Sequence, residues 1–316
     1  MGNGAYCTAQ AVDAKNFILR PPYKTAIALS AHCFNKTDHN GNVIGHYGLD
    51  EITFFGSYLA GDGGTVNYDI TADALWKNPL YHENRTVGDM AIAFSETALP
   101  SVVKPFQFLT TSDVDLKAGG IVSIFGHSGD LPYLTSHDCT RIENVEYTQI
   151  TSFGDMAQGS SGGGGVLSTI NSDGDCVLER TVDGAGKLIT VNEAVQSGTD
   201  TAIHMAVSKS ELNTVSYLRP VQQVDDGRCV QAAKITQSSF AYTLPNEHSV
   251  RLFSKEYHWR PVQIKTGQDV TYFGSEKDSL GKNWALIKFK DNEQIERHGY
   301  MLKNRMLKQQ EICFSF

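Results

Sequence analysis

The stretch from Gly154 to Gly165, GDMAQGSSGGGG, places two adjacent serines inside a run of glycines. Residues 159–163 read G-x-S-G-G, with Ser161 in the serine position. Glycines accept positive φ and let a substrate backbone approach closely. The amides of Gly159 and Ser161 can then point toward a developing oxyanion. The pattern favours an exposed nucleophile on a tight turn, and the alternative is a flexible glycine-serine loop.

Two further stretches place a polar side chain at one end of an apolar run. Residues 26–34 are strand-like and reach His32 directly before Cys33. Residues 87–94 begin with Val-Gly-Asp, so that Asp89 precedes an apolar run and would need a partner if buried. Taken singly, His32 could be a core histidine and Asp89 a turn residue. Together with Ser161 they give the chain order His, Asp, Ser, one of three recurring orders for a catalytic triad.

Length and strand pattern indicate an all-β protein of two domains. The 316 residues exceed one typical domain. Residues 1–215 read as short apolar segments separated by Gly, Asn and Asp clusters, which is typical of a β-sandwich or barrel. Residues 208–218 show helical spacing and end before Pro220.

The charge distribution supports a boundary near residues 220–240. Residues 1–235 carry 15 Lys and Arg against 26 Asp and Glu, a balance of −11, whereas residues 236–316 carry 12 against 9, a balance of +3. The acidic body argues against nucleic-acid binding. No apolar run approaches the ~18 residues of a membrane span.

The six cysteines favour disulfides over a metal site. They form no CxxC pair and no finger spacing, so we expect no zinc. Three disulfides would imply an oxidising compartment, and hence a secreted or periplasmic protein. Six buried free thiols in a cytosolic protein are the alternative. The cysteines are Cys7, Cys33, Cys139, Cys176, Cys229 and Cys313.

Residues 1 to about 220 resemble the trypsin-like serine peptidases. Residues 29–33 are similar to the family motif T-A-A-H-C, residues 89–91 to D-I-A, and residues 155–163 to D-x-C-Q-G-D-S-G-G. The resemblance implies a chymotrypsin-type double β-barrel with a C-terminal helix. It also implies a peptidase domain over residues 1–230 that acts on protein or peptide substrates without a metal or cofactor.

The resemblance assigns a role to each residue of the constellation. Ser161 would attack the scissile carbonyl, and His32 would accept its proton and pass it to the leaving amine. Asp89 would orient the imidazole. The amides of Gly159 and Ser161 would form the oxyanion hole. A silent homologue that serves as a binding scaffold is the competing hypothesis.

The family pattern also implies a specificity pocket. Asp155 lies six residues before Ser161, where trypsin-like enzymes hold the carboxylate that selects Arg or Lys, and Gln158 lies three before it. The alternative is that Asp155 caps a turn and faces solvent. Gly198 would line one wall and Ala202 the other, where a methyl group could shorten the pocket.

Three departures from the family motif point to bacterial-type members. Ala157 stands where the motif has Cys, Ser160 where it has Asp, and Gly164 where Pro is usual. The family pattern further implies a Cys7–Cys33 bridge beside the histidine. The remaining simplest pairing is Cys139–Cys176 and Cys229–Cys313.

Residues 236–316 resemble a bacterial Src-homology-3-like barrel, through short strands, a G-x-x-V turn and a late Gly-Tyr pair. The resemblance implies a small β-barrel domain that binds a peptide or cell-wall material. A targeting protein whose main activity lies in this barrel is a third functional hypothesis, and a purely packing extension is the alternative. Four side chains could line a groove or form a core: Tyr257, His258, Trp259 and Tyr272.

Overall fold

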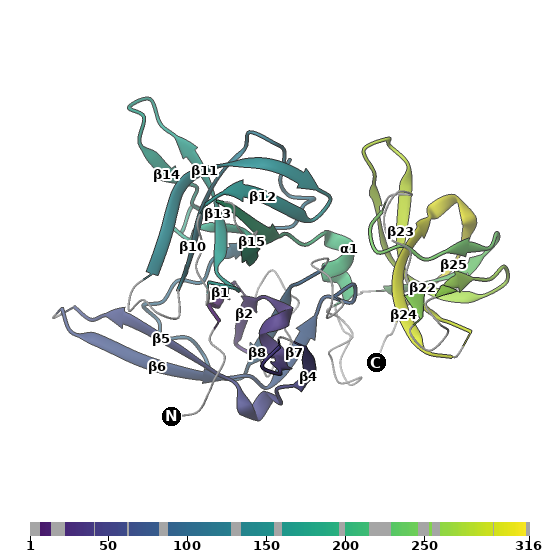
Figure 1. The fold of residues 1–316 in the computed structure, drawn as a ribbon, viewed down its shortest axis with the longest axis horizontal. Helices are drawn as coiled ribbons and strands as arrows, with labels where there is room; N and C mark the ends of the chain where they lie inside the picture. The colour runs from purple at the N-terminus through teal and green to yellow at the C-terminus, as the bar shows by residue number, and fades with distance from the viewer. Residues whose placement is uncertain are drawn as a thin grey trace. The chain divides into compact units, whose positions relative to one another are not determined.

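The computed structural model divides into two compact units, residues 1–207 and residues 208–316. Both units are built almost entirely of strands (Figure 1). The structure describes residues 7–13, 23–40, 42–61, 63–81, 88–127, 134–154, 160–195, 200–214, 229–245, 253–254, 260–292 and 294–313, with only the backbone at some strand positions.

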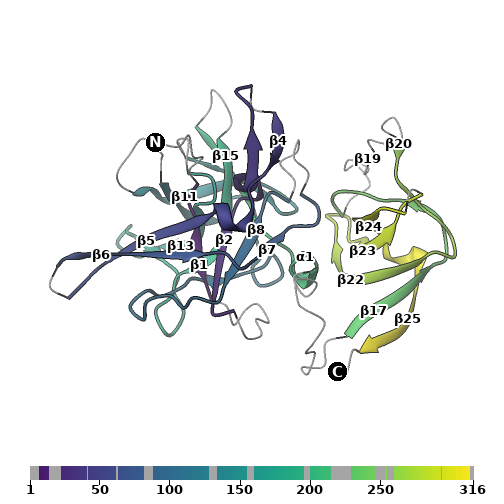
Figure 2. The same cartoon turned by 90° about the horizontal axis from the view of Figure 1, so that it is seen from below.

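The first half of unit 1 contains a four-stranded antiparallel sheet with order β1-β2-β8-β7 and two hairpins. Its central strands are buried at every residue, which explains their continuous apolar sequences. The β5–β6 hairpin projects from this unit in both ribbon views (Figure 2). The strands are β1 (Gln10–Val12), β2 (Thr25–Leu29), β3 (Asn35–Thr37), β4 (Val43–His46), β5 (Thr53–Leu59), β6 (Thr65–Thr71), β7 (Ala74–Lys77) and β8 (Ala91–Ser95).

The second half of unit 1 is a closed six-stranded barrel. Its strands follow the order β13-β10-β11-β12-β16-β15, and pairing of β13 with β15 closes the ring. Closure leaves no free sheet edge. A short β14 extends β13, and β9 runs parallel to β15. The strands are β9 (Gln107–Phe108), β10 (Ile121–His127), β11 (Leu134–Glu146), β12 (Gln149–Phe153), β13 (Gly164–Ile170), β14 (Cys176–Leu178), β15 (Lys187–Val195) and β16 (Thr201–Met205).

This architecture confirms the predicted all-β fold class. The closed barrel and the sheets that precede it are consistent with a chymotrypsin-type double barrel. Apolar side chains from all parts of the ring fill the barrel, as alternation along each strand requires. The buried members of this core are Leu109, Val122, Ile124, Ile142, Ile150, Ile189, Ala202 and Ala206.

Unit 2 holds a five-stranded sheet with order β24-β23-β22-β17-β25 and a short helix, α1 (Lys209–Leu212). Trp284 and Tyr300 are its largest fully buried side chains. Two short strand pairs, β18–β21 and β19–β20, accompany the sheet. The strands are β17 (Cys229–Ile235), β18 (Ser239–Phe240), β19 (Phe253–Ser254), β20 (Arg260–Pro261), β21 (Gln263–Ile264), β22 (Asp269–Lys277), β23 (Asn283–Lys290), β24 (Glu296–Leu302) and β25 (Met306–Cys313).

The contacts divide the chain earlier than the boundary predicted from charge and composition. Helix α1 was expected at the end of a peptidase domain reaching residue 230, but it packs on β22 in unit 2. Asn213 donates to the carbonyl of Phe273 at 2.9 Å, and Ser210 Oγ donates to Glu276 at 2.8 Å. These bonds join residues far apart in sequence, so composition alone does not locate the boundary. Residues 215–228 lie outside the described part.

Two of the three predicted disulfides are present. Cys7 is bonded to Cys33 and Cys139 to Cys176, with Cα–Cα distances of 6.2 and 5.6 Å. Cys229 and Cys313 are Cα partners across β17 and β25, but their side chains lie outside the described atoms. The third bridge stays a prediction.

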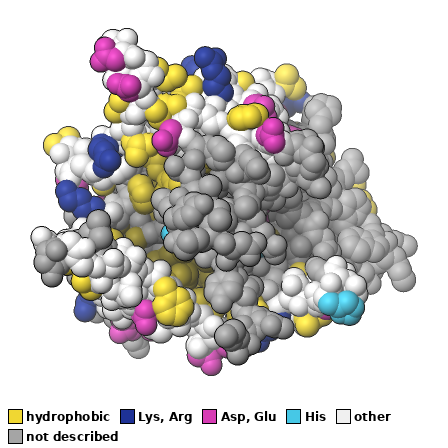
Figure 3. All heavy atoms as spheres, turned by 60° about the vertical axis from the view of Figure 1, so that its left-hand side comes forward, with side chains coloured by type: hydrophobic (Ala, Val, Ile, Leu, Met, Phe, Trp, Pro, Cys, Tyr) yellow, Lys and Arg dark blue, Asp and Glu magenta, His cyan; other side chains and the backbone are white. Residues whose placement is uncertain are grey.

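Two features of the described residues concern membranes and charge. None of their helices is long and apolar enough to cross a membrane. On the face drawn in Figure 3, the described Lys and Arg side chains are scattered among Asp and Glu rather than gathered in one basic patch.

Candidate active site

His32 and Asp89 form a close pair between two buried strands. His32 lies in a short 3₁₀ turn, Ala31–Phe34, which Ser30 separates from the end of β2. Asp89 is separated from the start of β8 by Met90 alone. Asp89 Oδ2 faces His32 Nδ1 at 2.5 Å, and Oδ1 accepts the main-chain N–H of His32 at 2.8 Å. Because β2 and β8 are hydrogen-bonded neighbours, their ends bring the two residues together.

The exposure of this pair is uneven. The side chain of Asp89 is 5% exposed, whereas that of His32 is 36% exposed. A carboxylate only accepts hydrogen bonds, so Nδ1 carries the proton that the pair shares. Nε2 is then the ring nitrogen with a free lone pair. The pair can therefore present a base to solvent while its carboxylate stays buried.

Ser161 lies in the turn that leads into β13, and this turn requires glycine. Gly162 has φ of +83°, and a Cβ there would collide with the carbonyl oxygen of Thr8. At Gly163 a Cβ would collide with the carbonyl oxygen of Phe125. The G-G pair after the serine is thus explained by backbone conformation and close packing.

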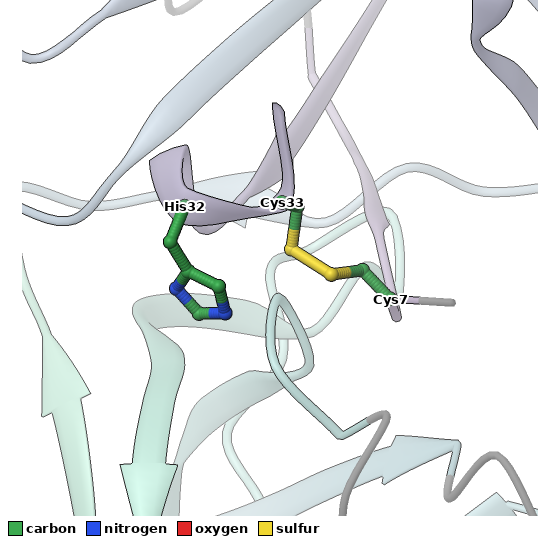
Figure 4. A group of neighbouring side chains, drawn as sticks. All are labelled: Cys7, His32 and Cys33. Carbon is green, nitrogen blue, oxygen red and sulfur yellow. A yellow bond between two sulfur atoms is a disulfide. The ribbon is translucent and has the colours of Figure 1, made fainter. Parts of the chain in front are cut away.

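The N-terminal segment connects the turn of Ser161 to that of His32. Thr8 donates its main-chain N–H to the carbonyl of Ser161 at 2.7 Å. The preceding residue, Cys7, is bonded to Cys33, which follows His32 (Figure 4). The sulfur atoms lie near the imidazole within metal-ligand spacing, but they are bonded to each other and offer no thiolates.

The hydroxyl of Ser161 donates to the main-chain carbonyl of Glu193 at 3.2 Å. Among the described residues there is no hydrogen bond between Ser161 Oγ and His32. Hydrogen bonds between catalytic groups are often long or poorly aligned before substrate binds. In this structure the hydroxyl of Ser161 is thus hydrogen-bonded to the main chain of β15.

Asn192, the residue before Glu193, ties three segments together. Its carbonyl accepts the N–H of Gly162 at 2.8 Å and the hydroxyl of Ser30 at 2.5 Å. Its own N–H donates to the carbonyl of Gly163 at 2.6 Å. Ser30 is two residues before His32, so one peptide group of β15 contacts both turns.

The side chain of Asn192 begins a buried polar chain inside the barrel. Its Oδ1 contacts His204 Nδ1 at 2.8 Å, and His204 Nε2 contacts Ser152 Oγ at 2.7 Å. Burial lowers the pKa of His204 to about 4, so the imidazole is neutral at neutral pH. No local sequence pattern marks this series of hydrogen bonds, because its members lie on three strands.

Glu193 is a second feature that sequence analysis missed. It is 4% exposed, and burial, followed by the negative charge of Asp89, raises the pKa of its carboxyl to about 9. A hydrogen bond from Gln149 acts in the opposite direction. The only local signal is an acidic residue inside the apolar run of residues 188–195.

The predicted pocket and oxyanion residues are mostly outside the described part of the chain. This applies to Asp155, Gln158, Gly159 and Gly198. Ala202 is described: it lies on β16 opposite Ser152 and is 1% exposed in the barrel core. In unit 2, Tyr272 is buried in the core, whereas residues 257–259 are not described.

Comparison with known proteins yields structural likenesses but no match by sequence. No protein-family model matches the chain, and no curated protein matches it by sequence. Among solved structures, the chain is similar to a thermostable serine protease, AL20, from an extremophilic microorganism. The identity is 14%, the TM-score is 0.42, and the match covers 68% of this chain and 98% of that one. A similarity of this size does not identify a function.

Proposed function

We propose that the chain is a serine endopeptidase in which Ser161 is the nucleophile, His32 the general base and Asp89 the residue that orients it. The observation that carries the proposal is the Asp89–His32 pair, whose buried carboxylate leaves Nε2 of a half-exposed imidazole free to accept a proton. The Ser161 turn is tied to the same region through Thr8 and Asn192.

In this reaction Nε2 of His32 takes the hydroxyl proton as Ser161 Oγ attacks the peptide carbonyl. The imidazolium that forms faces Asp89, which stabilises its positive charge, and later gives the proton to the leaving amine. Water then hydrolyses the acyl-enzyme by the same proton transfers. The step requires the hydroxyl of Ser161 to leave the carbonyl of Glu193 and turn toward His32. The amides of Gly159 and Ser161 would bind the oxyanion.

Active-site labelling tests the proposal directly. A fluorophosphonate probe should modify Ser161 of the full chain, and mass spectrometry of the digested product should place the label on that residue. The adjacent hydroxyl of Ser160 is an internal control, because it is 2% exposed. A folded protein that takes no label at Ser161 would contradict the proposal.

Within this proposal, cleavage follows Arg or Lys. The support is the position of Asp155 six residues before Ser161, with Gln158, Gly198 and Ala202 as further pocket residues. Steady-state cleavage of matched peptides with Arg, Lys, Phe, Ala or Glu before the scissile bond tests this preference. Fastest cleavage after Phe or Ala would contradict the preference for Arg or Lys. If Asp155→Ser left the preference unchanged, Asp155 would not belong to the specificity pocket.

The cysteines support a proposal on where the protein is located, and the C-terminal residues support a proposal on what it binds. Two disulfides among the described residues favour an oxidising compartment, so we place the protein outside the cytosol, secreted or periplasmic. Residues 236–316 are proposed to form a Src-homology-3-like domain that binds a peptide or cell-wall material. Comparing pulldown by the full chain and by variants in unit 2 tests that role.

A catalytically silent scaffold is the second candidate, favoured by one observation: the hydroxyl of Ser161 donates to a main-chain carbonyl rather than to His32. The two candidates differ in the labelling experiment. A scaffold binds peptide without reacting with the probe, whereas a peptidase loses its label when competing substrate is present.

A further inference from the structure

Glu193 occupies an irregular position in the barrel wall. The pairing of β15 with β16 shifts between Asn192 and Ala194, so Glu193 lies in a β-bulge without a partner residue on β16. Bulges redirect a side chain and are frequent beside active sites. Residues 191–193 are all buried, which strict alternation along a strand does not produce.

The carboxyl group of Glu193 is buried without a compensating cation. Its Oε2 is a buried atom without a hydrogen-bond partner. None of the ion pairs among the described residues includes Glu193. Burial raises the pKa of the Glu193 carboxyl, and among the nearby titratable groups Asp89 raises it further by its negative charge. His32 is bound to Asp89, and His204 of β16 is bound to Asn192 and Ser152. A buried carboxylate that faces no cation is costly even with the hydrogen bond from Gln149, so the neutral acid is the favoured form.

Glu193 is linked to both functional parts of the candidate site, to Ser161 by a hydrogen bond and to Asp89 by charge. Its main-chain carbonyl accepts the hydroxyl of Ser161 at 3.2 Å. Its side chain lies within reach of the charge of Asp89, which together with burial raises the pKa of Glu193 to about 9. Any change in its charge is therefore felt by the pair that Asp89 makes with His32.

We propose that Glu193 is a positioning residue of this site, which carries a proton at neutral pH and so adds no second negative charge beside the pair of Asp89 and His32. This inference rests on the proposed function. Ionisation of Glu193 adds a second buried negative charge beside Asp89, with no cation to balance it. Repulsion then separates the two carboxylates and disturbs the orientation of His32 and of the main chain that holds Ser161.

The pH profile of cleavage tests the proposal. We expect kcat/KM of the wild type to fall as pH rises through about 9, the value at which Glu193 ionises. Glu193→Gln keeps the shape of the neutral acid and cannot ionise. It should hold kcat/KM at neutral pH within about threefold of the wild type and lack that part of the alkaline fall.

Glu179→Gln is the matched control, because the same substitution is made in the same unit at a half-exposed residue that pairs with Lys187. Its profile should follow that of the wild type. A Glu193→Gln variant that is folded yet loses kcat/KM by about 100-fold at neutral pH would overturn the proposal. So would a Glu193→Gln profile that retains the full alkaline fall.

Carbon-13 NMR of the wild type decides the matter if Glu193→Gln does not fold. The carboxyl signal of Glu193 should titrate near pH 9, and the ring signals of His32 should shift in the same step. Titration at the ordinary pH of a glutamate, about 4.5, would overturn the inference. This readout needs no catalysis, so an absence of Ser161-dependent cleavage would contradict the proposed function while the titration still judges Glu193.

Discussion

Asp89 holds His32 by two contacts at once, one to the ring nitrogen Nδ1 at 2.5 Å and one to the main-chain N–H at 2.8 Å. The second contact fixes the backbone from which the imidazole projects, and the first fixes the ring itself. Orientation and tautomer of the imidazole thus depend on a single buried carboxylate. Neutralising that carboxylate should affect catalysis far more than it affects binding.

Asp89→Asn should lower kcat by about 10⁴, because an amide can donate to Nδ1 and so favours the wrong tautomer. The variant is nearly isosteric, so the protein should still fold. Steady-state kinetics and far-UV circular dichroism measure the two effects. Asp115→Asn, at an exposed site, should leave kcat unchanged. Full activity of folded Asp89→Asn would contradict the role given to this residue.

The two described disulfides should differ in their effect on activity. Replacing Cys7 and Cys33 by Ser should reduce stability by about 2–4 kcal/mol. It should also reduce kcat/KM, because Cys7 leads into Thr8, which holds the Ser161 turn. Replacing Cys139 and Cys176 should cost similar stability but leave kcat/KM near the wild-type value. Denaturant unfolding and kinetics at low temperature separate these effects, and equal losses of kcat/KM would argue against the coupling.

Gly162→Ala should destabilise the protein more than Gly174→Ala does. Both glycines have positive φ, +83° and +87°, so both substitutions incur the conformational cost of about 1–2 kcal/mol. A Cβ at Gly162 also collides with the carbonyl oxygen of Thr8, whereas at Gly174 it meets open space. Urea unfolding of both variants measures the difference. Equal destabilisation would show that the Ser161 turn can move to accept the Cβ at position 162.

The stability of the wild type relative to Glu193→Gln should depend on pH. The pKa of Glu193 is raised in the folded chain, so its favourable contribution is present below its ordinary pKa of 4.5 and is lost as pH rises toward about 9. Between these values the wild type should lose up to about 1.4 kcal/mol per pH unit relative to the variant. The contribution of His204 is common to both proteins and cancels. Urea unfolding across this range measures the gap, and a constant gap would contradict the raised pKa.

The sequence predicted those features that depend on local chemistry. The glycine pair after Ser161 marks a turn that only glycine can form, and the apolar runs beside His32 and Asp89 become the paired strands β2 and β8. The environment of Glu193 was not predictable, because its burial requires a bulge in β15 and the approach of Asp89 from the other half of unit 1.

The division of the chain into two units also depends on contacts between distant residues. Charge and composition change near residue 230, but the physical boundary follows contacts between α1 and β22. The bond from Asn213 to Phe273 joins residues 60 positions apart. No local sequence pattern indicates such a pairing, so composition alone does not show which unit contains the helix.

Peptide-library cleavage by Ser161→Ala and Ser160→Ala is the most direct test of the claim that Ser161 is the nucleophile of a serine endopeptidase. We expect Ser161→Ala to lose about 10⁴–10⁶ in kcat, because the three residues act as a unit. Ser160→Ala should keep most of the activity. Cleavage by folded Ser161→Ala at the wild-type rate, or loss of activity only in Ser160→Ala, would contradict the claim.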